Sequence, residues 1–266
     1  MRDEAPGRDA ILNTPRKDDE ETVEHPFRGR VTIYQPARGF RYSVDAFLLV
    51  DFAARTISGR KTGGVSAAEL GSGTGVISLG LALYPEIKRI IGIEIIPELV
   101  RMSNRSAAAS GLAGKTQFVE GDLKNPQAAG MGNDSFDMVV SNPPYRQVEK
   151  GRVSRDFARA VARHEVAAKI ADVAQAASRL LKSDGTLCVV YVPERLPELL
   201  VKLEDAGLKP RRIRFVHPHE TDPAKMVLVE ARKSSKGSLT IAPSFFVNDD
   251  SGNYTEEAQN TFEGPP

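Results

Sequence analysis

The residues with the most specific chemistry in this sequence are Asn142-Pro143-Pro144-Tyr145. A planar NH2 group, such as that of adenine or of a glutamine side chain, is a poor nucleophile because its lone pair is delocalised. If the Asn142 side-chain oxygen and the Pro143 carbonyl accepted its two N–H groups, they would stabilise the positive charge that develops as the nitrogen attacks. The two prolines stiffen the turn, and Tyr145 offers a flat face on which a base can stack. The tetrapeptide indicates chemistry on nitrogen, without specifying which nitrogen.

A glycine-rich loop, Glu69-Leu-Gly-Ser-Gly-Thr-Gly75, lies where an apolar run meets a helical pattern. In an α/β sheet this is where ligands bind, at the carboxyl ends of the strands. Gly71, Gly73 and Gly75 permit a tight turn and close approach of the backbone, because no Cβ obstructs either. Val76 occupies the position of the third glycine in a dinucleotide-phosphate fingerprint, so a pyrophosphate ligand is disfavoured. A plain strand-to-helix turn is the alternative for the loop by itself.

Two acidic residues at the ends of the following strands extend this candidate site. Glu94, followed by Ile95, lies about 20 residues beyond the loop, the spacing at which a carboxylate accepts hydrogen bonds from ribose hydroxyls. A solvated carboxylate at a strand end is the alternative for Glu94. Asp122, followed by Leu123, ends the third strand and could accept the exocyclic amine of adenine. Three strand ends thus converge on one nucleoside-shaped ligand.

The elements that would position these residues alternate between strands and helices. Apolar, β-branched runs predict strands at 65–70, 89–95, 116–120, 136–141, 186–192, 211–216 and 226–231. Amphipathic stretches predict helices at 76–84, 97–110, 163–181 and 194–206. The link between the last two strands is too short for a crossover helix, so these strands should form a closing antiparallel hairpin. The expected fold class is α/β: a Rossmann-like, seven-stranded, mostly parallel sheet with helices on both faces.

The segment 34–49, upstream of the first predicted strand, combines aromatic, basic and helix-opening residues. Ser43 or Asp45 could cap the helix that follows. Direct contact of this segment with a ligand is the alternative.

Composition and charge divide the chain into four parts. Residues 1–25 are polar, lack periodicity and carry a net charge of −4, so we expect a disordered acidic tail. Residues 26–64 should pack on a catalytic domain at 65–233, and residues 234–266 should form a partly flexible C-terminal extension. Residues 247–266 carry −5, which with the total of +1 leaves +10 on residues 26–246. Such a basic body is compatible with a phosphate-rich partner, although many proteins of similar charge bind no nucleic acid.

The single cysteine, Cys188, lies in an apolar run and is expected in the core rather than as a nucleophile. No disulfide can form within the chain, which fits a reducing compartment. No apolar stretch approaches the ~20 residues that a membrane span needs, and the first residues lack the apolar segment of a secretion signal. We therefore expect a soluble, cytoplasmic protein without a membrane partner.

A dense basic run follows the tetrapeptide and comprises Arg146, Lys150, Arg152, Arg155, Arg159 and Arg163. Such a cluster beside a target pocket fits an RNA or DNA backbone, and a solvated charged helix face is the alternative. The candidate substrate-binding residues are Pro144, Tyr145, Arg146, Arg152 and Arg155.

With these motifs, residues 65–233 resemble the class I S-adenosylmethionine-dependent methyltransferases. The resemblance implies S-adenosylmethionine as the cofactor, with the glycine loop against its methionine part, Glu94 at the ribose, and Asp122 and Leu123 beside the adenine. This cofactor carries no phosphate, in agreement with Val76 at the third glycine position. The candidate cofactor-binding residues are Glu69, Gly71, Ser72, Gly73, Thr74, Gly75, Glu94, Ile95, Asp122, Leu123 and Asn142. The candidate catalytic residues are Asn142, Pro143 and Tyr145.

Most of residues 30–257 further resembles the bacterial tRNA(Val) adenine-N6 methyltransferase family. The matching pieces are Tyr34-Gln-Pro through Asp45, the glycine loop, the tetrapeptide, Val216-His-Pro218, Leu228 to Lys233 and Tyr254-Thr-Glu256. The resemblance implies methyl transfer to N6 of an adenine in tRNA, namely the adenine beside the anticodon of tRNA(Val). The acidic N-terminal tail and a longer C-terminal end depart from the family's pattern. We expect a monomer.

The main alternative is a glutamine-N5 methyltransferase of a translation release factor, which would use the same loop, Glu94 and tetrapeptide. Such enzymes carry a helical domain before the sheet, and about forty residues between the polar tail and Val65 are too few for one. No target-recognition domain is visible for a DNA adenine methyltransferase, and Asn142 argues against a noncatalytic nucleotide-binding or dehydrogenase-like module. His217-Pro-His219-Glu220 has proline between its histidines and no cysteine partner, so we expect no metal.

Overall fold

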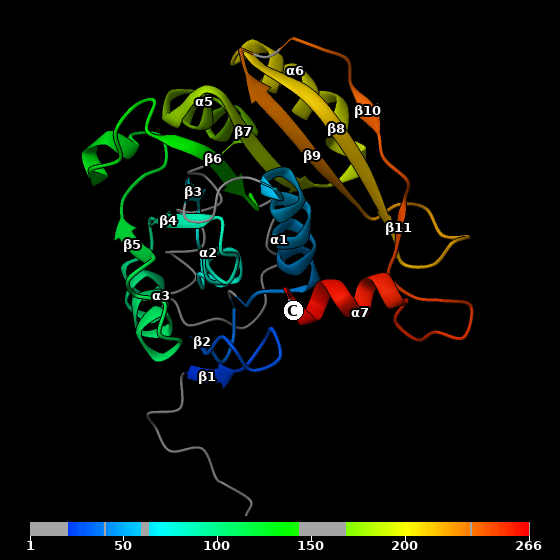
Figure 1. Ribbon diagram of the computed structural model, residues 1–266, viewed down its shortest axis with the longest axis horizontal. Helices are drawn as coiled ribbons and strands as arrows, with labels where there is room; N and C mark the ends of the chain where they lie inside the picture. Colours follow the sequence, from blue (N-terminus) through cyan, green and yellow to red (C-terminus); the bar gives the residue numbers. More distant parts are fainter. Residues whose placement is uncertain (1–20, 40, 60–63, 144–168, 235, 266) are drawn as a thin grey trace, which may run out of the picture.

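The apolar runs of the sequence come together as one nine-stranded sheet with the order β10-β8-β9-β7-β6-β3-β4-β5, in which β11 also pairs with β8 (Figure 1). The computed structural model describes residues 21–39, 41–59, 64–143, 169–234 and 236–265. The strands are β3 (Val65–Leu70), β4 (Ile87–Glu94), β5 (Thr116–Glu120), β6 (Phe136–Ser141), β7 (Leu181–Tyr191), β8 (Leu208–His217), β9 (Met226–Lys233), β10 (Thr240–Ile241) and β11 (Phe245–Phe246). From β3 to β7 the neighbouring strands are parallel, whereas β9 runs antiparallel between β7 and β8. The predicted α/β class and the closing antiparallel hairpin are confirmed.

Seven of these strands correspond to the seven predicted ones, and the predicted count is wrong by two. The chain after β9 adds β10 and β11, which pair in parallel with β8. Each is two residues long, and a strand this short leaves no alternation of apolar and polar residues in the sequence. These two strands form because they pair with β8, and not because of a pattern in their own residues.

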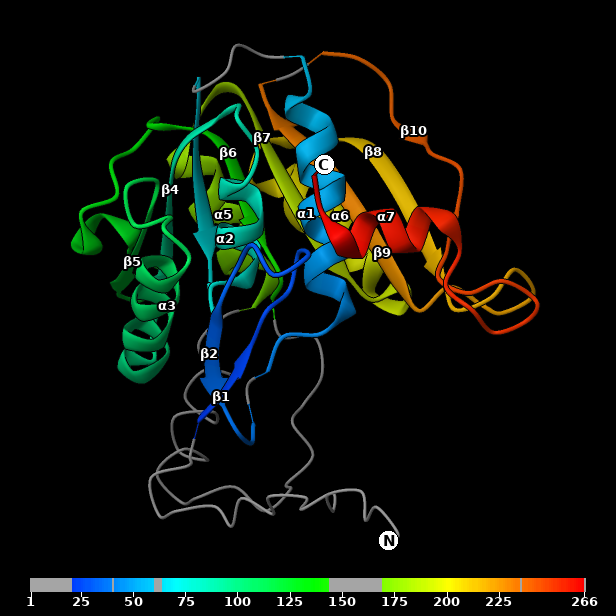
Figure 2. The same cartoon turned by 60° about the horizontal axis from the view of Figure 1, so that its bottom comes forward.

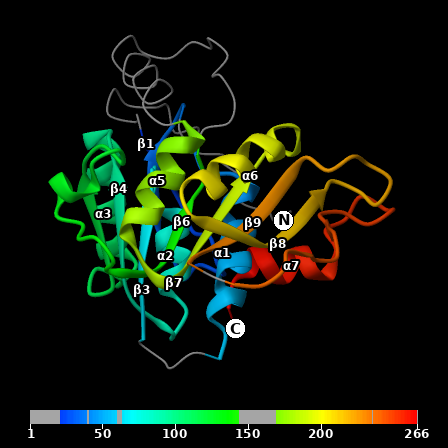
Figure 3. The same ribbon diagram turned by 90° about the horizontal axis from the view of Figure 1, so that it is seen from above.

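Helices cover both faces of the sheet, as predicted (Figure 3). The helices are α1 (Val44–Ile57), α2 (Val76–Ala82), α3 (Pro97–Ala109), α5 (Ile170–Leu180), α6 (Leu196–Asp205) and α7 (Glu256–Glu263), with short 3-10 turns at Pro126–Ala129 and Pro193–Arg195. Successive residues of a strand point to opposite faces. Ala67 of β3 accordingly packs with α1 and α2, and Ala68 packs with α5 and α6. Cys188 is fully buried, as predicted, in the core that contains Ala67 and the inner faces of α1 and α2.

No helix among the described residues combines the length and the apolar character needed to cross a bilayer.

The N-terminal part forms a separate two-stranded antiparallel sheet of β1 (Glu21–Glu24) and β2 (Ile33–Pro36) (Figure 2). The expected disordered tail at 1–25 is therefore wrong at its C-terminal end, while residues 1–20 lie outside the described residues. Two acidic residues of β1 have basic or hydroxyl partners: Glu21 pairs with Arg105, and Glu24 accepts from Arg41 and Tyr42. These contacts join residues far apart in the chain, which composition alone does not indicate.

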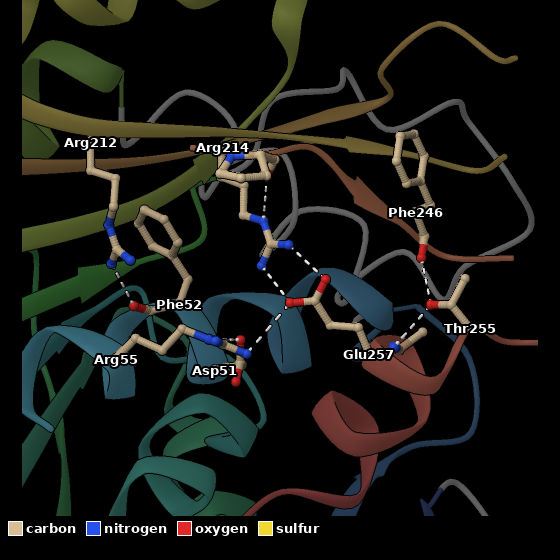
Figure 4. Close-up of polar contacts among 10 residues, drawn as sticks. Asp51, Phe52, Arg55, Arg212, Arg214, Phe246, Thr255 and Glu257 are labelled. Carbon is tan, nitrogen blue, oxygen red and sulfur yellow. Dashed lines mark hydrogen bonds and ion pairs between the residues drawn. The ribbon is translucent and has the colours of Figure 1, made fainter. Parts of the chain in front are cut away.

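The C-terminal part returns across the molecule, and helix α7 lies beside α1 (Figures 1 and 2). Figure 4 shows Arg214 of β8 reaching Glu257 of α7, where its two terminal nitrogens donate to the two carboxylate oxygens over 2.9 and 2.7 Å. Arg55 of α1 lies 3.5 Å from the same carboxylate. The Thr255 hydroxyl accepts from the Ala258 N–H at 3.1 Å and so caps α7. The elements β10, β11 and α7 are absent from the prediction for residues 234–266.

Candidate active site

A cavity of about 360 Å³ lies at the carboxyl ends of β3, β4 and β6. From β3 the chain proceeds to β4 on one side, and it returns to β6 on the other side. This reversal is the switch point at which open α/β sheets bind ligands. The cavity walls are the glycine loop after β3, Glu94 at the end of β4, Asn142 and Pro143 after β6, and the segment that leads into α1.

The glycine loop needs its glycines for two different reasons. Gly71, Gly73 and Gly75 have φ values of 73°, 52° and 80°, in the left-handed region that favours glycine. A Cβ at Gly75 would also lie 2.6 Å from Cζ of Phe118. A Cβ at Gly71 or Gly73 would meet no other atom within 4 Å, so the space beside these two residues is open. The loop backbone can therefore come close to a ligand in the cavity.

Glu94 connects the glycine loop to the start of α3. Its side chain is buried, with 1% of the residue exposed. One carboxylate oxygen accepts the Gly73 N–H at 2.9 Å, and the other accepts the Ile96 N–H at 3.0 Å. An ionised carboxylate oxygen has room for a further hydrogen bond. The backbone thus holds Glu94 in place at the wall of the cavity.

Glu69 is a second buried carboxylate at this cavity. One of its oxygens accepts the backbone N–H of Ser78 at 3.0 Å and also the Ser78 hydroxyl. Burial raises the pKa of Glu69 to about 8, against the opposing effect of these hydrogen bonds, and the nearby Glu94 raises it further. Two acidic groups at one cavity favour a ligand that carries positive charge. The buried hydroxyl oxygen of Ser72 also lines the cavity and has no hydrogen-bond partner among the described residues.

Asn142 follows β6, and its side chain contacts α1. The Asn142 Nδ2 donates to Asp45 Oδ2 over 2.9 Å. The other oxygen of Asp45 accepts from the Ala46 N–H at 3.0 Å and from the Ser43 hydroxyl at 2.5 Å. Pro143 is buried and lines the cavity beside Asn142. The start of the tetrapeptide therefore shares one cavity with the glycine loop and Glu94.

The structure brings together eight of the twelve predicted site residues that it describes. Those that line the cavity are Glu69, Gly71, Ser72, Gly73, Thr74, Glu94, Asn142 and Pro143. Gly75, Ile95, Asp122 and Leu123 are not part of this lining, and Asp122 is exposed, with its Oδ1 accepting the Lys124 N–H at 2.9 Å. Pro144, Tyr145, Arg146, Arg152 and Arg155 lie outside the described residues.

The sequence analysis gave ligand contact by the segment 34–49 only as an alternative, and it did not include the wall that precedes and opens α1 among the site residues. Arg41, Tyr42, Ser43 and Asp45 all line the cavity. Ser43 stands at the N-cap position of α1, as predicted, but its side chain makes no capping hydrogen bond and instead donates to Asp45. The sequence signals for this wall were the aromatic and basic residues of the segment 34–49 and the Ser43-Val-Asp45 pattern at a helix start, which also fits a simple cap.

The two histidines considered as metal ligands contact a loop residue. The Nδ1 atom of His217 lies 2.7 Å from the Asp222 carbonyl oxygen, and that of His219 lies 2.9 Å from the Asp222 carboxylate. Within the part of the chain that the structure describes, no group of three or more His, Cys, Asp or Glu residues could hold a metal ion.

Comparisons with known proteins agree with this geometry. A family model described as "Methyltransferase domain" matches residues 61–229. The chain is 29% identical to a tRNA1(Val) (adenine(37)-N6)-methyltransferase of Porphyromonas gingivalis, over 76% of this chain and 78% of that protein. Four further relatives with this name are 30–37% identical over 40–64% of this chain, which is 45–66% of their own lengths.

Two other similarities are to proteins with different names. A release factor glutamine methyltransferase of Chlorobaculum tepidum is 30% identical over 46% of this chain and 44% of that protein. The crystal structure of a predicted O-methyltransferase from Agrobacterium tumefaciens superimposes with a TM-score of 0.66 and 20% identity, over 84% of this chain and 98% of that one. At this identity, the superposition concerns the fold alone.

Proposed function

Because this chain belongs to the methyltransferase domain family, we propose that it transfers a methyl group from S-adenosylmethionine to the exocyclic N6 of an adenine in tRNA. The observation that carries the proposal is the shared cavity: Asn142 and Pro143 line the same walls as the glycine loop and Glu94. An acceptor nitrogen held by Asn142 and Pro143 would thus lie next to a cofactor held by the glycine loop and Glu94.

The described residues fit S-adenosylmethionine as the methyl donor. Its sulfonium and ammonium groups are positive, which suits the buried Glu94 and favours the ionised form of Glu69, whose pKa is about 8 in the ligand-free protein. Glu94 would accept the ribose hydroxyls, and the open space at Gly71 and Gly73 would admit the methionine part. The hydroxyl oxygen of Ser72, for which the described part of the chain offers no hydrogen-bond partner, would gain one there. Ile95, Asp122 and Leu123 are proposed for the adenine end, on the edge formed by β4 and β5.

In this proposal the protein stabilises the positive charge that develops on the acceptor nitrogen, and it does not remove a proton first. S-adenosylmethionine supplies a methyl group bonded to a positively charged sulfur. Asn142 Oδ1 and the Pro143 carbonyl would accept the two N–H groups of the acceptor, which favours the positive charge as the nitrogen–carbon bond forms and the carbon–sulfur bond breaks. The proton then leaves the nitrogen for solvent. Tyr145 is proposed to stack on the base and align its nitrogen with the methyl group.

Adenine of tRNA is the preferred acceptor because the relatives with the longest similarity carry that activity in their names. Within tRNA we propose the adenine beside the anticodon of tRNA(Val), and therefore a cytoplasmic site of action. The net charge of +10 on residues 26–246 supports a partner rich in phosphate. Arg146, Arg152 and Arg155 are proposed to contact the RNA backbone.

The second candidate acceptor is a glutamine of a translation release factor, favoured by the similarity to the Chlorobaculum tepidum protein. A glutamine amide presents the same planar NH2 group, so Asn142 and Pro143 would act on it in the same way. Among the described residues, however, the part before β3 holds β1, β2 and the single helix α1. This alternative would use the same site. The relatives that match over a longer part of the chain, however, carry the name of the tRNA activity.

The decisive experiment incubates the protein with methyl-labelled S-adenosylmethionine and, separately, with unmodified tRNA and with unmethylated release factor. Mass spectrometry of the digested products then identifies the methylated group. We expect label in N6-methyladenosine of tRNA. Label only in N5-methylglutamine would replace the proposed acceptor by the second candidate, and label in neither substrate would contradict both.

Asn142→Ala tests the chemistry at the tetrapeptide. We expect kcat to fall by about 100-fold or more, the usual consequence of removing one preorganised polar group from the charge-stabilising site. Affinity for S-adenosylmethionine, measured by calorimetry, should stay within about threefold, because Glu94 and the loop remain. Turnover at the wild-type rate would contradict the role given to Asn142.

A further inference from the structure

An asparagine can serve an acceptor NH2 group in only one of its two amide orientations. Rotation of the amide by 180° exchanges Oδ1 and Nδ2, which are nearly the same size. With Oδ1 toward the acceptor, the amide receives an N–H, whereas with Nδ2 there, two donors would face each other. The proposed function, on which this inference rests, therefore requires something in the protein that selects the orientation of Asn142.

The selecting group in the structure is a carboxylate on another element. Asp45 Oδ2 receives the Nδ2 donor of Asn142 over 2.9 Å, across 97 residues of sequence. An ionised carboxylate has acceptors and no donor. Rotating the Asn142 amide would turn its oxygen toward the carboxylate, which loses the hydrogen bond and brings two acceptors together. We propose that Asp45 is a positioning residue that keeps the Asn142 oxygen directed to the acceptor nitrogen.

Asp45 is itself held firmly enough to act in this way. It is 7% exposed, and its second oxygen accepts from the Ala46 N–H and the Ser43 hydroxyl. Its position in the first turn of the 14-residue helix α1 places negative charge at the positive end of the helix dipole. Helix α1 in turn is packed in the core, where Leu48, Leu49 and Phe52 are buried. A side chain with these supports changes its orientation little.

The contact also assigns a task to a part of the chain outside the recognised domain. The family model begins at residue 61, whereas Asp45 belongs to the segment before β3. Ser43 and Asp45 both line the cavity from that segment. The N-terminal part would therefore contribute to the rate of methyl transfer, in addition to covering the sheet.

The test exchanges the two partners of the contact. Asp45→Asn replaces a group that only accepts by an amide that can donate or accept, so it no longer selects one orientation of Asn142. Asn142→Asp alone brings two carboxylates together. Both single variants should therefore show reduced kcat. The double variant Asp45→Asn/Asn142→Asp restores one donor opposite one acceptor with reversed polarity, and it keeps an oxygen for the acceptor N–H. We expect the double variant to turn over at least about tenfold faster than Asn142→Asp alone. If it is no faster, Asp45 serves only to start α1 and the proposal is wrong.

The steady-state constants and a matched variant separate positioning from stability. Asp45→Asn should lower kcat while KM for S-adenosylmethionine stays within about threefold. Asp51→Asn removes a carboxylate from the same helix that pairs with Arg55 instead, and we expect wild-type kcat for it. A loss of kcat in Asp51→Asn equal to that in Asp45→Asn would mean that any damage to α1 has this effect, which overturns the proposal.

A measurement without any substrate keeps this inference distinct from the proposed function. In the 15N-labelled protein, the side-chain NH2 signal of Asn142 can be identified by its loss in Asn142→Asp. Its exchange with solvent should be slower in the wild type than in Asp45→Ala, because the hydrogen bond protects it. Equal exchange rates would overturn the role of Asp45 even if tRNA is methylated. Absence of methylation with a protected signal would contradict the function and leave the contact supported.

Discussion

Three acidic side chains line the cavity, and backbone N–H groups donate to all three. Glu94 receives two backbone N–H groups, Glu69 receives the backbone and hydroxyl of Ser78, and Asp45 receives the amide of Asn142. Burial of a carboxylate costs free energy unless hydrogen bonds or a positive ligand compensate for it. The two glutamates are thus suited to a cationic ligand, and Asp45 contacts the asparagine that we propose to bind the acceptor.

At the residue scale, Glu94→Gln is expected to weaken binding of S-adenosylmethionine by about tenfold or more, since hydrogen bonds to charged groups contribute roughly 1.5–3 kcal/mol. The amide keeps one acceptor oxygen, but its NH2 group must face the N–H of Gly73 or of Ile96. Isothermal titration calorimetry measures the change. Glu98→Gln, on the exposed first turn of α3, is the control and should bind normally. Unchanged affinity in Glu94→Gln would remove Glu94 from the cofactor site.

The raised pKa of Glu69 predicts a pH dependence of stability in the ligand-free protein. With a pKa of about 8 in the folded state, against 4.5 as the ordinary value, the folded protein binds the proton more tightly than the unfolded chain does. This contribution to stability is complete below about pH 4.5 and is lost as the pH rises to about 8. Thermal unfolding between pH 5 and 8 should show Tm falling less in Glu69→Gln than in the wild type. Parallel curves for the two proteins would refute the assignment.

Residue-level prediction from the sequence succeeds where a side chain stands next to a recognisable boundary. Glu94 ends β4 and Asn142 directly follows β6, so their meeting at one sheet edge follows from parallel topology. Asp45 stands at a helix start, and its contact with Asn142 depends on how α1 packs against the end of β6. That packing links residues 97 positions apart, and no local pattern records it.

At the scale of elements, the glycine loop shows how tightly a turn and a strand are fitted together. Gly75 ends the loop and begins α2, and the Phe118 ring of β5 fills the space where its Cβ would be. The loop is also tied to β4, because the N–H groups of Gly71 and Ser72 donate to the Ile93 carbonyl at 2.9 and 3.0 Å. Displacement of the Phe118 ring would therefore disturb the proposed cofactor site.

Gly75→Ala is expected to lower the free energy of unfolding by about 2–4 kcal/mol. About 1–2 kcal/mol comes from a left-handed φ without glycine, and the remainder from moving Phe118. Gly111→Ala is the matched control, because Gly111 has a φ of 68° and no atom within 4 Å of the added Cβ. Urea denaturation of both variants isolates the packing part. Equal destabilisation of the two would show that Phe118 moves aside without cost.

The central strands were predictable because each is a continuous apolar run between two covered faces. The bounds of β3, β5 and β6 agree with the predicted ranges residue for residue. In contrast, β1, β10 and β11 are two to four residues long and lie at edges. Their conformation depends on the partner strand, so their own residues carry little signal. Helix α7 had a usable signal in Thr255-Glu256-Glu257, a capping residue before acidic residues.

At the scale of the whole molecule, the C-terminal part connects elements that are distant in sequence. Glu257 of α7 contacts Arg214 of β8 and Arg55 of α1. Farther along α7, Glu263 pairs with Arg28, and the Phe262 ring lies 5.8 Å from that of Phe47. The helix that carries Asp45 is therefore held by both the sheet and the end of the chain.

Glu257→Ala should destabilise the protein by about 1–3 kcal/mol, because Arg214 is 13% exposed and would lose both hydrogen bonds to a carboxylate. Glu256→Ala, on the exposed neighbouring residue, should change stability by less than about 0.5 kcal/mol. Thermal and urea unfolding provide the comparison. Equal stability of the two variants would mean that α7 is held by its apolar contacts alone.

The insertion of β9 between β7 and β8 has a consequence for the ribosome-bound chain. Residues 226–233 pair with both neighbours, yet they are synthesised after both. Until they leave the exit tunnel, β7 and β8 have no common partner, and the backbone groups of β7 that face β9 remain an open edge. The N-terminal strands can assemble during translation, but the sheet becomes continuous only after residue 233 has left the tunnel. A nascent chain stalled before residue 226 should thus expose an edge that chaperones bind.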